Sequence, residues 1–163
     1  MPPRWPFLLT LAAAIGCGGP HFDGRTFRND TLAFQVGPIP SHWRQLSAAH
    51  ALLAFRDDEG SATVGVNARC GRDGDDVPLE SLTHHLFLHF TDRQVISQEL
   101  LKLDGRDALR TEMQAELDGV PKNFTIYVLK KDGCVYDMLH IADHSGGGQA
   151  QFDQFATGFR TLQ

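Results

Sequence analysis

The order of hydrophobic and polar residues predicts short β-strands in the first half of the chain. Leu32, Phe34 and Val36 alternate with residues that point the other way, which is the pattern of a half-buried strand. Pro38 and Pro40 end this strand, because proline cannot donate to a sheet ladder. The predicted strands are residues 32–36, a short strand that Trp43 opens, and two hairpin arms at 51–55 and 61–70.

A helical period appears twice. The first apolar stripe predicts a helix over about residues 78–91, and it consists of Leu79, Leu82, Leu86 and Phe90. The second predicts a helix over residues 152–162, and it consists of Phe152, Phe155, Phe159 and Leu162. Gly158 interrupts the second helix and costs up to about 1 kcal/mol relative to alanine, so we expect a close packing contact there.

Between the two helical segments, Asp-Gly pairs recur at a regular interval. They occupy positions 104–105, 118–119 and 132–133, and each favours a tight hairpin turn. The segments between them are rich in strand-forming residues, so four strands joined by three tight turns form an antiparallel meander. The last two of these strands are apolar on both sides, which predicts a central position covered by helices.

This order of elements predicts the α+β class. We expect one antiparallel sheet of about seven or eight strands, with a long C-terminal meander and helices packed against it. The globular domain is predicted to span residues 27–163 as a single unit.

The beginning of the chain is unlike the rest. Arg4 precedes an apolar run from Phe7 to Ile15, too short to span a membrane as a helix. The pattern Ala14-Ile15-Gly16-Cys17 resembles the lipobox of bacterial lipoprotein signal peptides. The resemblance implies that residues 1–16 are a signal peptide, that Cys17 receives lipid and that residues 17–26 are a tether. Ordinary secretion, with cleavage nearby, is the alternative.

The implied location is the bacterial cell envelope. Gly18 rather than Asp follows the cysteine, which by resemblance to enteric lipoproteins favours the outer membrane facing the periplasm. Two or three acyl chains would anchor a soluble domain stably. We therefore expect the protein to contact the membrane through its N-terminal lipid.

The folded part resembles the PsbP-like superfamily, which includes a photosystem accessory protein, a Ran-binding import factor and many bacterial lipoproteins. The resemblance rests on the opening LAFQVGPIPSHW, the helix after the fourth strand, the meander and the phenylalanine-rich final segment. It implies an α/β/α sandwich that works in binding or assembly. No catalytic residue and no cofactor is implied.

Charge and motifs narrow the function further. The net charge is −5 without a cluster of Lys or Arg, which argues against nucleic-acid binding. His85 and His89 are four residues apart in the first predicted helix and are weak candidates for a metal site, to which His140 or His144 would add a third ligand. The alternative is that these are ordinary surface histidines.

Cys70 and Cys134 remain once Cys17 carries lipid. An exported protein meets an oxidising compartment, so we expect these two thiols to form a disulfide. Two separate buried thiols are the alternative.

Together these observations predict a lipid-anchored, non-catalytic envelope protein that binds another protein or a small ligand. A periplasmic metal-binding or enzymatic domain that uses the helix histidines is the second possibility.

Overall fold

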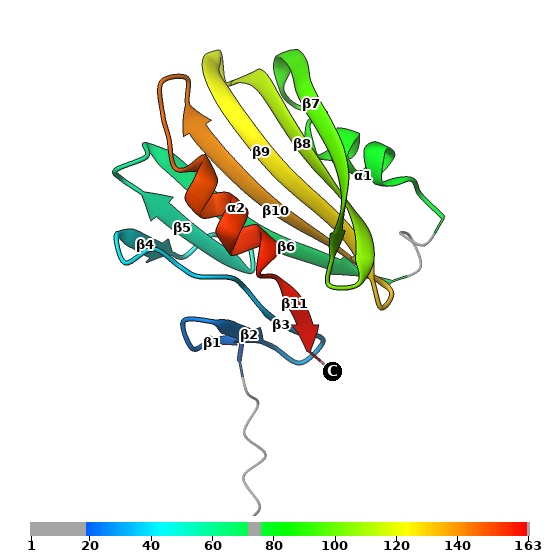
Figure 1. The fold of residues 1–163 in the computed structure, drawn as a ribbon. Helices are drawn as coiled ribbons and strands as arrows, with labels where there is room; N and C mark the ends of the chain where they lie inside the picture. The colour runs from blue at the N-terminus through cyan, green and yellow to red at the C-terminus, as the bar shows by residue number, and fades with distance from the viewer. Residues whose placement is uncertain (1–18, 72–75, 163) are drawn as a thin grey trace, which may run out of the picture.

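A computed structural model describes residues 19–71 and 76–162, which form two antiparallel sheets and two helices (Figure 1). The main sheet contains β4 (Trp43–Leu46), β5 (Leu53–Asp57), β6 (Ala62–Cys70), β7 (Thr91–Leu103), β8 (Arg106–Leu117), β9 (Val120–Lys131) and β10 (Cys134–Asp143). The small sheet contains β1 (His21–Phe22), β2 (Thr26–Arg28), β3 (Ala33–Gln35) and β11 (Arg160–Leu162). The helices are α1 (Leu79–Leu86) and α2 (Gln149–Thr157).

The seven strands of the main sheet lie in the order β4-β5-β6-β10-β9-β8-β7. Each neighbouring pair is antiparallel, so the predicted α+β class and the four-stranded meander β7–β10 are confirmed. β10 and β9 lie inside the sheet, as their two apolar sides indicated. α2 crosses one face of the sheet and α1 lies against the other (Figure 1).

The Asp-Gly pairs form the three turns of the meander. Asp104, Asp118 and Asp132 each have a φ near +50°, and the glycine that follows each has a φ between 71° and 77°. Two successive residues with positive φ match the right-handed twist of the strands they join, which is why this dipeptide fixes the hairpins.

The alternation of β9 divides the core between the two faces. Tyr127 belongs to a large cluster beneath α2, whereas its neighbour Ile126 belongs to a smaller cluster beneath α1. Phe152 and Phe155 on α2 are fully buried in the large cluster, and Phe87 is a buried member of the small cluster.

The prediction of one helix over residues 152–162 is wrong in its second half. α2 ends at Thr157, and Arg160–Leu162 form β11, which pairs with β3. Gly158 is the residue at the end of the helix, where a Cβ would lie 2.3 Å from the Cα of Gly37. The expected close contact is present, and it joins two backbones where the chain leaves the helix.

Three other boundaries differ from expectation. The helix predicted over residues 78–91 covers only Leu79–Leu86. The tether predicted to continue to residue 26 already contains β1 and the first residue of β2. The strand predicted at 32–36 lies in a second sheet that the sequence did not suggest, because β3 pairs with β2 and β11 rather than with the hairpin that follows it.

Cys70 and Cys134 form the predicted disulfide. They are directly paired across β6 and β10, at the end of the sheet where the last meander turn lies. The proposed lipid attachment at Cys17 lies outside the described residues. None of the described helices is long and apolar enough to cross a membrane.

Candidate functional site

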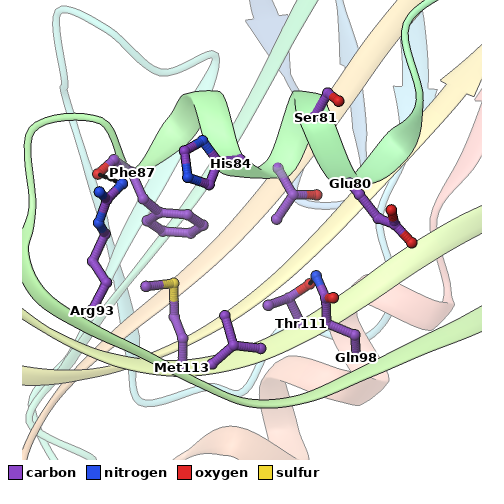
Figure 2. A pocket seen from close by; sticks show the side chains of 10 residues that line it. Glu80, Ser81, His84, Phe87, Arg93, Gln98, Thr111 and Met113 are labelled. Carbon is purple, nitrogen blue, oxygen red and sulfur yellow. Dashed lines mark hydrogen bonds between the residues drawn. The ribbon is translucent and has the colours of Figure 1, made fainter.

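A hollow of about 600 Å³ lies between α1 and the sheet strands β7 and β8 (Figure 2). We call it the α1–β7 hollow. The side chains of α1 form one wall, and those of β7 and β8 form the wall opposite (Figure 2). The residues that line it are Glu80, Ser81, Thr83, His84, Phe87, Arg93, Val95, Gln98, Thr111 and Met113.

Local packing holds α1 in this position. The Thr83 hydroxyl donates a hydrogen bond to the Leu79 carbonyl over 2.8 Å and is buried against the sheet. The Phe87 ring meets the Phe124 ring of β9 edge-on, with centroids 5.9 Å apart. At Phe87 the backbone leaves the helix, with φ −110° and ψ 11°. The helix therefore ends after two turns and leaves the strands beyond it uncovered.

Polar groups are fixed around an apolar floor. Gln98 on β7 donates to the Thr111 hydroxyl on β8 over 3.2 Å. Arg93 donates one hydrogen bond of 3.2 Å from Nη1 to the Phe87 carbonyl, at the end of α1. Since a guanidinium has five N–H donors, Arg93 keeps donors for a ligand. Phe87 and Met113 supply buried apolar surface below.

This combination of an apolar floor and fixed polar groups suits ligand binding. A ligand site of several hundred Å³ commonly joins apolar lining to a few oriented polar groups, and the α1–β7 hollow has both. Acidic Glu80 and basic Arg93 lie at its two ends (Figure 2), so a bound segment could be oriented by charge.

The exposed edge of β7 adjoins the hollow. β7 is the last strand of the main sheet and pairs with β8 on one side only. Its exposed apolar residues are Val95 at 55%, Ile96 at 56% and Leu100 at 66%. Register shifts interrupt the pairing before Ser97, and from Ser97 to Leu103 the pairing with β8 is regular. That regular segment leaves a straight row of backbone N–H and C=O groups for another strand.

The histidines predicted as metal ligands do not converge. His85 lies on α1 and His89 lies beyond its end, so the helical four-residue spacing that paired them does not exist. His140 is buried on β10 on the opposite face of the sheet, and His144 is exposed. Within residues 19–71 and 76–162, no three His, Cys, Asp or Glu side chains are grouped to hold a metal ion.

Sequence reasoning missed the residues that shape the hollow. Arg93 and Gln98 belong to no motif, and their neighbours on α1 lie more than five residues earlier in the chain. The one available signal was the run of exposed β-branched and polar residues along β7, which marks an edge strand.

No protein-family model matches the chain, and no curated protein sequence matches it. Several solved structures are similar to it in fold. The solution structure of the cyanobacterial PsbP protein CyanoP from Synechocystis superposes with a TM-score of 0.64 at 12% identity, covering 94% of this chain and 99% of that one. LpqN, involved in cell envelope biogenesis of Mycobacterium tuberculosis, gives a TM-score of 0.55 at 13% identity, covering 88% and 90%.

A crystal structure from Bacteroides thetaiotaomicron gives a TM-score of 0.57 at 12% identity. The match covers 80% of this chain but spans only 45% of the Bacteroides chain. At these identities the likeness concerns the fold, and the chain has a PsbP-like fold.

Proposed function

We propose that this chain is a lipid-anchored accessory protein of the bacterial cell envelope, which binds a partner protein and does not itself catalyse a reaction. The observation that carries the proposal is the α1–β7 hollow beside the free edge of β7. A partner segment that adds as a strand along Ser97–Leu103 gains main-chain hydrogen bonds, and a neighbouring side chain can enter the hollow for specificity.

Two further observations support a location in the bacterial cell envelope. The lipobox-like pattern ending at Cys17 favours attachment to a membrane. A protein of similar fold, LpqN, is described as involved in cell envelope biogenesis. The alternative of a metal-dependent domain built on His85 and His89 loses support, since His89 lies outside α1.

The anchor is tested with Cys17→Ser in the full chain, expressed in a bacterial host. The wild-type protein should partition with the membrane and into detergent. Cys17→Ser should appear as an unprocessed precursor or in the aqueous fraction. Gly19→Ala is the matched control, because a Cβ at Gly19 meets nothing within 4 Å. Wild-type protein that stays aqueous without detergent would contradict the anchor.

Partner binding is tested by photo-cross-linking in intact envelopes. Benzoylphenylalanine replaces Val95 beside the hollow, Leu100 on the regular edge, or Val120 at the start of β9 as a control of similar exposure. A discrete adduct should form from Val95 and Leu100 but not from Val120. The adduct should weaken when Arg93→Ala and Gln98→Ala are combined. Equal adducts from all three positions, or none, would contradict docking at β7.

A further inference from the structure

A second hollow lies on the other face of the main sheet, at the N-terminal end of α2. Its volume is about 380 Å³, and Gly146, Gly147 and Gly148 lie at its rim, so we call it the triglycine hollow. Cross-strand pairing aligns Glu112, Thr125 and His140 in one row of its floor. Gln114 and Asn123 form the next row. A polar stripe thus crosses β8, β9 and β10 on the face that α2 covers.

His140 presents an unpaired ring nitrogen to this hollow. The side chain is buried, with 3% exposure, and its ring stacks on Phe152 with centroids 5.3 Å apart. Burial lowers the pKa of His140, against the opposing effects of Asp57 and Asp153, so the ring is neutral. Nε2 has no hydrogen-bond partner among the described residues. A hydroxyl group can satisfy Nε2 in either tautomer of the ring, because a hydroxyl both donates and accepts.

Asn123 presents a second unpaired polar atom, which is an acceptor. Its Nδ2 donates to the His144 carbonyl over 2.9 Å, and more weakly to the Asp143 carbonyl over 3.4 Å. Those two bonds fix the orientation of the amide. Oδ1 is buried and has no hydrogen-bond partner within the described part of the chain. Leaving a buried polar atom unpaired is unfavourable, so both atoms favour a ligand that forms hydrogen bonds with them.

The rim supplies donors. Gly148 is the N-cap of α2, and no side chain caps the first turn. The first N–H groups of a helix have no intrahelical partner, and here they open beside the glycines. A Cβ at Gly147 would meet nothing within 4 Å, so a ligand can approach the backbone there. Gly148 packs against the protein instead, since a Cβ there would lie 2.5 Å from Asp57 Oδ2 and 3.4 Å from His140 Nε2.

This arrangement selects against ions. The one charged side chain lining the hollow is Glu112, which already accepts from Arg110 and Gln149 over 2.6 Å each. An ammonium group has no acceptor for the helix N–H groups, and a phosphate would bring negative charge next to the Glu112 carboxylate. Hydroxyl groups both donate and accept, so a compound with several hydroxyls satisfies the floor and the rim together.

We propose that the triglycine hollow binds a neutral polyhydroxyl ligand, a sugar ring, whose hydroxyl groups pair with His140 Nε2 and Asn123 Oδ1 and accept from the N–H groups at the start of α2. The site differs from the α1–β7 hollow, since His140 stacks on Phe152 of α2 and Glu112 accepts from Gln149 of α2, and Met113 lines both hollows.

The test is an NMR titration of the ¹⁵N-labelled full chain in a zwitterionic detergent that carries no sugar. D-glucose, methylammonium and inorganic phosphate are the three probes. Glucose should produce saturable shifts at Gly146–Gly148 and at the His140 Nε2 resonance. His140→Phe, which keeps the ring stacked on Phe152, should weaken glucose binding at least about tenfold. Arg93→Ala in the α1–β7 hollow is the control and should leave the titration unchanged.

Several outcomes would overturn the proposal. Absence of saturable shifts with glucose would mean that the hollow holds only water. Tighter binding of methylammonium or phosphate than of glucose would assign a charged ligand instead. If His140→Phe does not fold, the wild-type spectrum still decides, because glucose binding that leaves the His140 Nε2 resonance unmoved contradicts the contact with Nε2. None of these outcomes bears on cross-linking at Val95, so the two proposals fail separately.

Discussion

The two faces of the main sheet are covered to different extents. On the α2 face, a continuous aromatic cluster joins the helix to both sheets, and its fully buried rings include Phe34, Phe152, Phe155 and Phe159. On the α1 face, a shorter helix covers a smaller cluster and leaves the α1–β7 hollow open. The contrast predicts that the α2 face supplies most of the stability, and it leaves the α1–β7 hollow for the partner proposed above.

Polar contacts reinforce the difference. Arg110 on β8 forms a two-pronged ion pair with Asp153 on α2, with N–O distances of 3.1 and 3.0 Å. The Tyr127 hydroxyl donates to the same carboxylate over 2.7 Å. Beside α1, the Lys130 ammonium donates to the Val77 carbonyl just before the helix begins. α2 is thus joined to the sheet through its own side chains.

The largest effect is expected at the aromatic cluster. Phe155→Ala should lower the free energy of unfolding by about 3–5 kcal/mol, because the ring is fully buried and contacts Trp43, Phe55 and Phe152. Urea unfolding followed by tryptophan fluorescence measures the change. Leu82→Ala, which truncates a half-buried residue of α1, is the matched control and should lose less. A loss under about 1 kcal/mol for Phe155→Ala would remove the contrast between the faces.

The disulfide should rank next. Replacing both Cys70 and Cys134 by serine should lower the free energy of unfolding by up to about 4 kcal/mol, because the bridge closes a loop over a separation of 64 residues. Thiol counting in denatured Cys17→Ser protein checks the bridge itself. Two alkylatable thiols before reduction would show that it does not form.

The Arg110–Asp153 pair should contribute less. A double-mutant cycle with Arg110→Gln and Asp153→Asn should give a coupling energy of about 1–2 kcal/mol, since the pair is two-pronged and the Arg110 side chain is 13% exposed. The exposed pair Lys102–Asp107 on the β7–β8 hairpin is the control and should couple more weakly. Equal coupling in the two cycles would mean that α2 gains nothing special from this contact.

The smallest effects are opposite pH dependences on the two faces. Burial raises the pKa of Asp137 above 3.8 on the α1 face despite Arg69, and burial lowers that of His140 below 6.5 on the α2 face. The free energy of unfolding should therefore decline through Asp137 as pH rises above 3.8, and decline through His140 as pH falls below 6.5.

Urea unfolding at a series of pH values separates the two contributions. Asp137→Asn should remove the first decline and His140→Phe the second. Slopes that both variants leave unchanged would show that neither buried group titrates differently in the folded and unfolded chains.

Local signals explain what the sequence could predict. The meander was predictable because each Asp-Gly pair defines its turn within two residues, and the strands alternate up to it. The final strand, β11, was not predictable, because Phe155, Phe159 and Leu162 keep a helical spacing across the end of α2. The contacts that hold the segment after the helix come from elsewhere in the chain: Asp104, 57 residues earlier, accepts hydrogen bonds from the backbone and hydroxyl of Thr161 in β11.

The two hollows were unpredictable for a related reason. The α1–β7 hollow exists because α1 ends at Leu86, and apolar spacing alone continued that helix to Phe90. His140 lies in a strand that is apolar on both sides, so no local pattern placed it beside Asn123 and the three glycines. Only the register between β9 and β10 brings them together.

The small sheet has a consequence for the order in which the chain folds. Its strands β1, β2 and β3 come from the first described residues, and β11 comes from the last. The meander can form from contacts between neighbours in sequence, whereas the β3–β11 seam must close a loop of more than a hundred residues. This seam is thus expected to form late. The same seam makes the two ends of the domain interdependent, so shortening the chain before Arg160 would leave an open edge on β3.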